Sequence, residues 1–456
     1  MKILLKTAWI VAIETLSWIE LQKQSERLAL ARTVKQLGIR DHNAVRYAYG
    51  LVVETVRRKN LIDKFVNSVL KPAQISEFNM GVQAFLRLYV YQTRIAKRWG
   101  EFDLKEAESI AKLGRAILGW KTLRAVEPVL GFLLTRQLDS ILKAVNIEEK
   151  IALQTFQPTW FVKYCINLLG RREAGAYLKG NVNPPPSYIR VNTLKAPEEV
   201  ILEKLAAEGV NLEKIGQLKH VYKVASTKQS LVDATSFREG LFYIQDKASC
   251  FAAEVADAKP NMTVLDVCAA PGAKTTYLAQ LMQNQGSIFS LDYSLRRLQA
   301  WMREVRRMGV KTAVPVLADA RVFLPFAIEA DVVVLDPPCT STGAFAKQPS
   351  TKWRLTPRSI DKMAEIQWRM INNCAERVKT GGVLTYSTCS ITVEENEMII
   401  ERFLEQHPEF SLAEIKPKFG VSGLRGLDKC QRLYPHIHES NGFFIAKLRK
   451  QQKPRN

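Results

Sequence analysis

The feature that most constrains the fold of this chain is the alternation of short apolar segments with amphipathic stretches of helix length in its second half. The amphipathic stretches, such as residues 294–308 and 360–378, carry apolar residues at helical spacing. The apolar segments each have the length of one strand and lie at residues 263–267, 286–291, 313–317, 332–335 and 382–386. This alternation predicts a mostly parallel, Rossmann-like sheet covered by helices on both faces. Ligand sites in such folds lie at the carboxyl ends of the strands.

The first part of the chain predicts an all-α helical bundle. Asp41 is a candidate N-cap, and Val45, Tyr49 and Val52 follow it at helical spacing. Glycine and proline are sparse in this region, and no strand alternation persists. Two basic clusters, Arg57-Arg58-Lys59 and Lys97-Arg98, are either solvated helix faces or contacts for RNA.

A small α+β module is predicted between these two regions. Short β-prone pieces at residues 188–191 and 221–224 flank a helical segment at residues 197–209. We therefore expect a multidomain protein with three parts. They are a helical domain over 1–145, a linker and α+β module over 146–239, and an α/β domain over 240–450.

Charge and cysteine usage limit the class of protein. The formal net charge is +21, which favours a polyanionic partner bound over a broad surface. The seven cysteines are spread singly without a CxxC pair, so we expect no disulfide framework, no metal site and a cytoplasmic location. No stretch approaches the roughly 18 apolar residues of a membrane span, so we expect no membrane association, and we expect a monomer. Four cysteines are expected to be buried core residues: Cys165, Cys250, Cys374 and Cys430.

A small-residue turn, DVCAAPGAKT at residues 266–275, joins the first apolar segment of the α/β region to a helix. Its small side chains allow a ligand to approach the backbone, and the helix N-terminus favours an anionic group. Asp292 and Asp319 follow the next two predicted strands, where carboxylates suit ribose hydroxyls and an adenine amino group. The turn has neither the Walker lysine pattern nor G-x-G-x-x-G, so S-adenosylmethionine fits better than ATP or NAD.

Two cysteines follow later strands, Cys339 in the sequence Asp336-Pro-Pro-Cys and Cys389 in Ser387-Thr-Cys-Ser. Methyltransferases acting on exocyclic amino groups end a similar turn with an aromatic residue, so a cysteine there argues for chemistry on a ring carbon. Carbon 5 of cytosine becomes nucleophilic enough for methylation when a thiolate adds to carbon 6, and a base must later remove the carbon 5 proton. Asp336 is placed to act beside ring nitrogen 3.

These motifs resemble those of the RNA 5-methylcytosine methyltransferases of the Nop2/Sun family. The resemblance covers about residues 150–450 and includes RVNTLK at 190–195 and QDKAS at 245–249. It implies that Cys389 is the nucleophile, that Cys339 assists release of the methylated RNA and that Asp336 contacts the cytosine. It implies a substrate contact by Lys247. It also implies a methyl-donor site formed by Cys268, Ala269, Ala270, Pro271, Gly272, Ala273, Lys274, Asp292, Asp319 and Asp336.

The sequence departs from the family pattern at two positions. Ala273 stands where the family usually has a second glycine, and a methyl group is tolerated there if φ stays negative. Pro337 stands where bacterial members often have alanine. The helical region is similar to the NusB-like RNA-binding domain of the bacterial RsmB type, which acts on 16S rRNA. The expected partner is therefore RNA, with rRNA favoured over tRNA.

The resulting hypothesis is methylation of carbon 5 of a cytosine in RNA, most simply small-subunit rRNA. One alternative keeps the chemistry and makes tRNA the substrate. Another is DNA methylation with the two cysteines exchanging roles, because Pro338-Cys339 is the Pro-Cys dipeptide expected in DNA enzymes. A third alternative is a non-catalytic RNA-binding or antitermination factor with a vestigial methyltransferase domain.

Overall fold

The structure is a computed structural model that describes residues 2–96 and 103–452 of the chain. It divides into two compact units. Unit 1 comprises Met1–Asn183 together with Phe345–Leu355, and unit 2 comprises Pro184–Ala344 together with Thr356–Asn456. Every residue that the sequence assigns to catalysis or to cofactor binding lies in unit 2.

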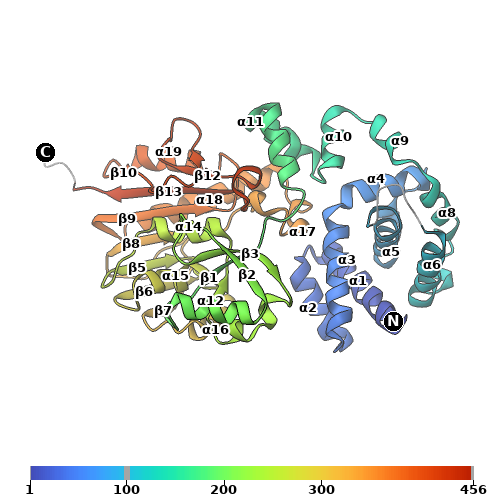
Figure 1. The fold of residues 1–456 in the computed structure, drawn as a ribbon. Helices are drawn as coiled ribbons and strands as arrows, with labels where there is room; N and C mark the ends of the chain where they lie inside the picture. Colours follow the sequence, from blue (N-terminus) through green and yellow to red (C-terminus); the bar gives the residue numbers. More distant parts are fainter. Residues whose placement is uncertain (1, 97–102, 453–456) are drawn as a thin grey trace. The chain divides into compact units, whose positions relative to one another are not determined.

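Unit 1 is helical throughout its described residues (Figure 1). Asp41 caps α3 as predicted, because its carboxylate accepts hydrogen bonds from the backbone N–H groups of Asn43 and Ala44 at 3.0 and 3.1 Å. The prediction of an all-α N-terminal region is confirmed. The α-helices are α1 (Lys2–Gln22), α2 (Glu26–Leu37), α3 (His42–Arg57), α4 (Lys59–Leu70), α5 (Met80–Val90), α6 (Leu104–Leu118), α7 (Trp120–Leu123), α8 (Glu127–Thr135), α9 (Leu138–Lys143), α10 (Ile147–Gln154), α11 (Thr159–Gly180) and α17 (Pro349–Lys352), with a 3-10 turn at Ile75–Glu77 and a π-helical turn at Tyr91–Ile95.

One hydrophobic core joins the helices of unit 1. Trp9 of α1, Phe65 of α4 and Phe85 of α5 are all buried in it. Gly114 of α6 lies against Phe85, and a Cβ atom there would come within 2.4 Å of a ring carbon. Only glycine permits this close approach of α6 to the aromatic ring without a shift of the core.

The segment Phe345–Leu355 is held in unit 1 by buried hydrogen bonds. The guanidinium of Arg57, which is 3% exposed, donates to the carbonyl of Ala346 at 2.6 Å. The ammonium of Lys352 donates to the carbonyl of Arg57 at 3.0 Å. The sequence had led us to expect either a solvated side chain or an RNA contact at Arg57. Arg57 is neither, because it is buried and satisfies a buried carbonyl group. Lys97 and Arg98 of the second basic cluster lie outside the described residues.

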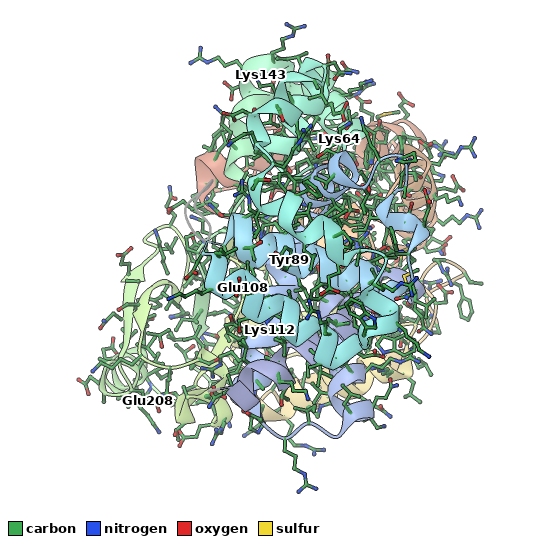
Figure 2. All side chains as sticks on the ribbon, turned by 90° about the vertical axis from the view of Figure 1, so that its right-hand side faces the viewer. Lys64, Tyr89, Glu108, Lys112, Lys143 and Glu208 are labelled. Carbon is green, nitrogen blue, oxygen red and sulfur yellow. The ribbon has the colours of Figure 1, made fainter. Side chains whose placement is uncertain are left out.

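Charged side chains are spread over the surface of unit 1 (Figure 2). Among those labelled in Figure 2, Lys64, Lys112 and Lys143 are exposed, whereas Tyr89 is buried in the core. The ammonium of Lys64 forms an ion pair with Glu149 at 2.8 Å. Exposed lysines of this kind contribute long-range attraction to a polyanion.

Unit 2 begins with a small antiparallel sheet in the order β2–β3–β1–β4. The helix α12 (Glu198–Ala207) packs on it through Ile201 and Leu205, which join Ile189 and Val191 in one apolar cluster. The predicted strands at residues 188–191 and 221–224 and the helix between them are confirmed. The strands are β1 (Tyr188–Val191), β2 (Val210–Lys214), β3 (Val221–Thr227) and β4 (Phe242–Ile244).

The large sheet of unit 2 has the order β11–β12–β13–β9–β8–β5–β6–β7, with β10 paired to β13 (Figure 1). Strands β5 to β9 pair in parallel and correspond to the five predicted strands. Strands β10 to β13 add antiparallel pairs that were not predicted. The strands are β5 (Thr263–Val267), β6 (Ser287–Asp292), β7 (Ala313–Leu317), β8 (Ala330–Leu335), β9 (Val378–Thr388), β10 (Phe410–Leu412), β11 (Val421–Ser422), β12 (Gln431–Leu433) and β13 (Phe443–Lys450).

Alternate residues of the parallel strands pack against helices on opposite faces of this sheet. Val264 and Val332 share an apolar cluster with α15 on one face. Leu265 and Val333 share another with α18 and α19. This is the expected consequence of the two-residue side-chain period of a strand. The helices of unit 2 beyond α12 are α13 (Thr235–Arg238), α14 (Lys247–Val255), α15 (Ala273–Leu281), α16 (Leu295–Arg307), α18 (Pro357–Ala375), α19 (Glu397–Gln406) and α20 (Pro435–His438).

Candidate active site

The candidate active site lies at the edge where the parallel strands of unit 2 end. The central strand β5 pairs with β8 on one side and with β6 on the other, so the strand order reverses there and creates a topological switch point. Val267, the last residue of β5, lies opposite Leu291 and Leu335, and Leu335 lies opposite Tyr386. The residues at the ends of these strands therefore share one edge: Cys268, Asp292, Asp336 and Ser387.

The small-residue turn between β5 and α15 has an unusual backbone. Cys268 and Gly272 both have positive φ, at 68° and 111°. Gly272 directly precedes α15, and Ala273 is the first residue of that helix. The left-handed conformation thus falls on the glycine, and Ala273 has a helical backbone in which its methyl group causes no strain. The turn leaves the N-terminus of α15 at the strand edge, as the sequence predicts.

A cavity of about 240 Å³ lies beside this turn, and its lining includes Cys268, Asp292 and Asp319. Asp292 ends β6, is 1% exposed and accepts hydrogen bonds from the backbone N–H groups of Ser294 and Ala270 at 3.1 and 3.4 Å. Arg321 donates to both carboxylate oxygens of Asp319, and these hydrogen bonds lower the pKa of Asp319. Two fixed carboxylates in one cavity fit the hydrogen-bond donors of a nucleoside. The cavity is also lined by three apolar residues of α18 that the sequence did not single out: Met363, Ile366 and Met370.

The two strand-end cysteines contact one another. The Sγ atoms of Cys339 and Cys389 are 3.2 Å apart, and the Ser341 hydroxyl lies 3.3 Å from Sγ of Cys389. Hydrogen bonding with Cys339, and then with Ser341, lowers the pKa of Cys389 even though burial opposes this shift. The same hydrogen bond to Cys389, together with burial, raises the pKa of Cys339. The pair therefore favours a thiolate on Cys389 and a neutral thiol on Cys339.

Asp336 lies next to this pair at the end of β8 and has two side-chain partners. The ammonium of Lys274 donates to Oδ2 at 2.6 Å, and the hydroxyl of Ser387, two residues before Cys389, donates to Oδ1 at 3.3 Å. Burial alone would lower the pKa of Lys274, but the carboxylate of Asp336 raises it overall. The sequence assigned Lys274 to the backbone of the cofactor turn, and the structure shows in addition that its side chain orients Asp336.

Lys247 begins α14 and is 8% exposed. Its ammonium lies over the rings of Tyr188 and Phe419 at 5.0 and 5.8 Å from their centroids. Burial lowers its pKa. The substrate contact of Lys247 stays a prediction.

Four other cysteines are buried and do not belong to the pair of Cys339 and Cys389. They lie in the protein core as predicted: Cys165, Cys250, Cys374 and Cys430. Over residues 2–96 and 103–452, no three His, Cys, Asp or Glu side chains are grouped so that they would bind a metal ion. In the same ranges, no helix has both the length and the apolar composition required to cross a membrane.

Comparison with known families places this site in context. Residues 253–449 match the model of the 16S rRNA methyltransferases RsmB/F, and residues 157–227 match the ferredoxin-like domain of RsmF/B-like methyltransferases. A similarity over nearly the whole chain is found with the probable ribosomal RNA small subunit methyltransferase B of Bacillus subtilis. The two are 30% identical over 453 residues, which cover 96% of this chain and 98% of the relative.

Two further proteins are similar to this chain, one over about half of its length and the other over nearly all of it. The tRNA (cytosine(72)-C(5))-methyltransferase of Pyrococcus horikoshii is 38% identical over 221 residues, which cover 48% of this chain and 55% of the relative. The crystal structure of PH0851 has a TM-score of 0.80 and 30% identity, and the match covers 98% of this chain and 99% of that one. The chain therefore belongs to the RsmB/F family of RNA (cytosine-5) methyltransferases, whose methyl donor is S-adenosylmethionine.

Proposed function

We propose that this enzyme methylates carbon 5 of a cytosine in 16S rRNA through a covalent bond between Cys389 and carbon 6 of the base. The observation that carries this proposal is the 3.2 Å separation of the Cys389 and Cys339 sulfur atoms beside the carboxylate of Asp336. Carbons 5 and 6 are bonded neighbours in the ring. Two thiols this close can therefore act on one base, one at each carbon.

In the first step, the Cys389 thiolate uses a lone pair to form the sulfur–carbon 6 bond. The electrons of the carbon 5–carbon 6 double bond move so that carbon 5 becomes the nucleophile. Asp336, held by Lys274, lies beside ring nitrogen 3, where hydrogen bonding or proton transfer stabilises the adduct. Because carbon 6 must be open to the thiolate, the target base has to be unstacked or flipped.

In the second step, once carbon 5 carries the methyl group, Cys339 removes the carbon 5 proton after losing its own proton to water. The carbon 5–carbon 6 double bond re-forms, the carbon 6–sulfur bond breaks, and the electron pair returns to Cys389 as a thiolate. Formation of the adduct consumes the Cys389 thiolate, and the hydrogen bond to that thiolate is the largest cause of the raised pKa of Cys339. Attachment of the cytosine to Cys389 therefore makes Cys339 easier to deprotonate at the stage when a proton acceptor is required.

The residues of the switch point fit the methyl donor, which supplies an electrophilic methyl group when bound. We assign the backbone of residues 268–274 to its close contacts, because the turn has small side chains and leaves the N-terminus of α15 at the strand edge. Asp292 is assigned to the ribose hydroxyls and Asp319 to the adenine amino group. The apolar residues of α18 that line the same cavity provide the surface on which an adenine ring packs.

The choice of ribosomal RNA rests on how much of the chain each similarity covers. The small-subunit rRNA relative matches both the helical unit and the catalytic unit, whereas the tRNA relative matches less than half of the chain. We infer that the helical unit contributes to RNA binding, as in the NusB-like domain that it resembles. A ribosomal substrate also implies action in the cytoplasm.

Two alternatives are less well supported by the site. DNA-type chemistry with Cys339 as nucleophile requires Cys339 to be the more acidic thiol, whereas the hydrogen bond between the cysteines favours the thiolate on Cys389. A vestigial methyltransferase domain is expected to lose members of its site, whereas both cysteines, Asp336 and Lys274 lie together here.

The proposal is tested by bisulfite sequencing of total RNA from cells that lack the gene and from cells complemented with the wild type or Cys389→Ala. The expected result is loss of one methylcytosine in 16S rRNA, restored by the wild type and not by the variant. Loss of a tRNA methylcytosine instead would assign the other substrate. An unchanged pattern at every RNA cytosine would contradict the proposal.

A further inference from the structure

A buried carboxylate contacts both loops that carry the cysteines. Glu395, in the segment between β9 and α19, has an exposed fraction of 0%. Its Oε1 accepts a hydrogen bond from the backbone N–H of Thr340 at 2.8 Å. Its Oε2 accepts hydrogen bonds from the hydroxyls of Ser390 and Thr392 at 2.6 and 2.7 Å, and from the hydroxyl of Thr340. Thr340 directly follows one catalytic cysteine, and Ser390 directly follows the other.

A fifth donor reaches the carboxylate from α18. The amide of Gln367 donates to Oε1 of Glu395 at 2.9 Å and to the carbonyl of Pro338, also at 2.9 Å. The five hydrogen-bond donors named above are backbone, hydroxyl and amide groups, and each is neutral. Burying a carboxylate costs several kcal/mol unless hydrogen bonds replace its hydration. Because a carboxylate only accepts, through about four lone-pair positions, it suits a pocket made of donors.

The two loops are also bonded directly to each other around this carboxylate. The backbone N–H of Gly343 donates to the carbonyl of Cys389 at 2.9 Å, and the N–H of Ile391 donates to the hydroxyl of Thr342 at 3.0 Å. A Cβ atom at Gly343 would lie 2.1 Å from the carbonyl oxygen of Gly442, so a larger residue would displace the loop. Glu395 thus occupies the centre of a packed junction between two segments about 50 residues apart in sequence.

We propose that Glu395 is a positioning residue of this methyltransferase, whose carboxylate fixes the loop of Cys339 relative to the loop of Cys389 so that both thiols act on one cytosine. The inference rests on the proposed two-cysteine mechanism. Attack and proton removal take place at adjacent ring carbons, so the two sulfur atoms must keep a fixed relation to each other. A displacement of about 1 Å in such a site costs on the order of 10²-fold in rate.

A role in folding alone makes a different prediction from a positioning role. If Glu395 only stabilises the fold, its removal lowers folding, cofactor affinity and turnover together. If it positions the cysteine loops, its removal lowers turnover while the affinity for S-adenosylmethionine is kept, because the cofactor residues Asp292 and Asp319 lie outside its hydrogen bonds.

Two substitutions at Glu395 distinguish loss of the hydrogen-bonded junction from loss of the negative charge. Glu395→Ala removes all the acceptors. Glu395→Gln keeps an oxygen for the Thr340 N–H and the Gln367 amide, and its own amide donates to hydroxyl oxygens that can act as acceptors. Glu395→Gln therefore preserves most hydrogen bonds of the junction, although the hydroxyl groups become acceptors instead of donors. It should keep the function that Glu395→Ala loses.

Two further variants serve as controls. Glu254→Ala removes a carboxylate of the same unit whose hydrogen-bond donors, the Lys219 N–H and the Tyr277 hydroxyl, do not belong to the cysteine loops. Thr340→Val keeps the backbone N–H bond to Glu395 and removes the hydroxyl that contacts Glu395 and Ser390. It is the fallback if Glu395→Ala does not fold, and it is expected to slow release and to accumulate the RNA adduct.

The experiment measures, with full-length protein and 16S rRNA, kcat, KM for S-adenosylmethionine and thermal stability for wild type, Cys389→Ala and these variants. The positioning role predicts that Glu395→Ala loses about 10²-fold in kcat with KM within about twofold, that Glu395→Gln stays within about tenfold of wild type, and that Glu254→Ala keeps its kcat. Wild-type kcat in Glu395→Ala, or equal losses in the Ala and Gln variants, would overturn the positioning role. Equal activity of wild type and Cys389→Ala would instead overturn the proposed mechanism.

Discussion

The sulfur atoms of Cys339 and Cys389 lie 3.2 Å apart, at the ends of two neighbouring loops that follow parallel strands. Their hydrogen bond gives the two thiols opposite acidities, with the pKa of Cys389 lowered and that of Cys339 raised. Two chemically identical side chains thereby differ in acidity. In the proposed mechanism, Cys389 attacks as the thiolate and Cys339 becomes a base after that thiolate is consumed.

Cys339→Ala is predicted to raise the pKa of Cys389, because it removes the hydrogen bond that is the main cause of the lowered pKa. A thiol with a higher pKa has less thiolate at any given pH, so alkylation of Cys389 should move to higher pH. The measurement is the rate of iodoacetamide modification against pH, followed by mass spectrometry of the peptide that contains Cys389. Cys339→Ser keeps a donor and should lie nearer to wild type. An identical profile in wild type and Cys339→Ala would show that the hydrogen bond does not set this pKa.

Asp336→Asn is predicted to lower kcat by about 10²- to 10⁴-fold, the range of general acid–base contributions. The variant keeps the shape of the side chain but loses the negative charge that pairs with Lys274. Asp361→Asn, at an exposed position of α18, is the matched control and should keep its activity. Turnover of Asp336→Asn within a few-fold of wild type would remove this carboxylate from the mechanism.

Asp292→Ala is predicted to weaken binding of S-adenosylmethionine by about tenfold to a hundredfold. The loss corresponds to the roughly 1.5–3 kcal/mol of hydrogen bonds to a charged group. Isothermal titration calorimetry gives the dissociation constant directly. Asp331→Ala serves as the control. It changes a carboxylate near the start of β8, at the amino-terminal ends of the parallel strands and not at the carboxyl ends that form the site. Equal affinities of the two variants would place the ribose elsewhere.

Lys352→Met is predicted to destabilise unit 1, because the buried ammonium donates to the carbonyl groups of Arg57 and Phe156. An unsatisfied buried carbonyl costs about 1–3 kcal/mol. Thermal unfolding of the full chain should show a lower melting temperature than the wild type, whereas Lys121→Met, at an exposed position of α7, should not. If the two variants have the same melting temperature, the segment that contains Lys352 is not held by these hydrogen bonds.

The parallel strands were predictable because strands buried on both faces are nearly continuous apolar runs. Thr263–Val267 reads TVLDV and Ala330–Leu335 reads ADVVVL, each with one aspartate. The antiparallel strands at the end of the chain were not predicted. Strand β11 has two residues and β10 and β12 have three each, which is too short for any periodicity to show. Strand β13 has eight residues, so shortness does not explain why it was missed. The division into three domains and the roles of the individual site residues remain predictions.

The candidate site was predictable as far as strand ends define it. The sequence placed Cys339, Cys389 and Asp336 at one edge, and the structure brings the two cysteines into contact, with Asp336 bonded to Ser387, two residues before Cys389. It did not indicate the side-chain role of Lys274, because a motif does not give the direction in which a side chain points. Glu395 was missed for a related reason: its partners Thr340 and Ser390 come from two distant motifs, and only the fold brings them together.

The most direct test of the two-cysteine mechanism is the covalent complex between RNA and the Cys339→Ala variant. The variant is incubated with 16S rRNA and S-adenosylmethionine at a pH above its own Cys389 alkylation midpoint, and the products are separated on a denaturing gel. We predict a slowly migrating protein–RNA species that is absent from wild type and from Cys339→Ala/Cys389→Ala. Absence of this species from Cys339→Ala, or its persistence in the double variant, would contradict attack by Cys389 and release through Cys339.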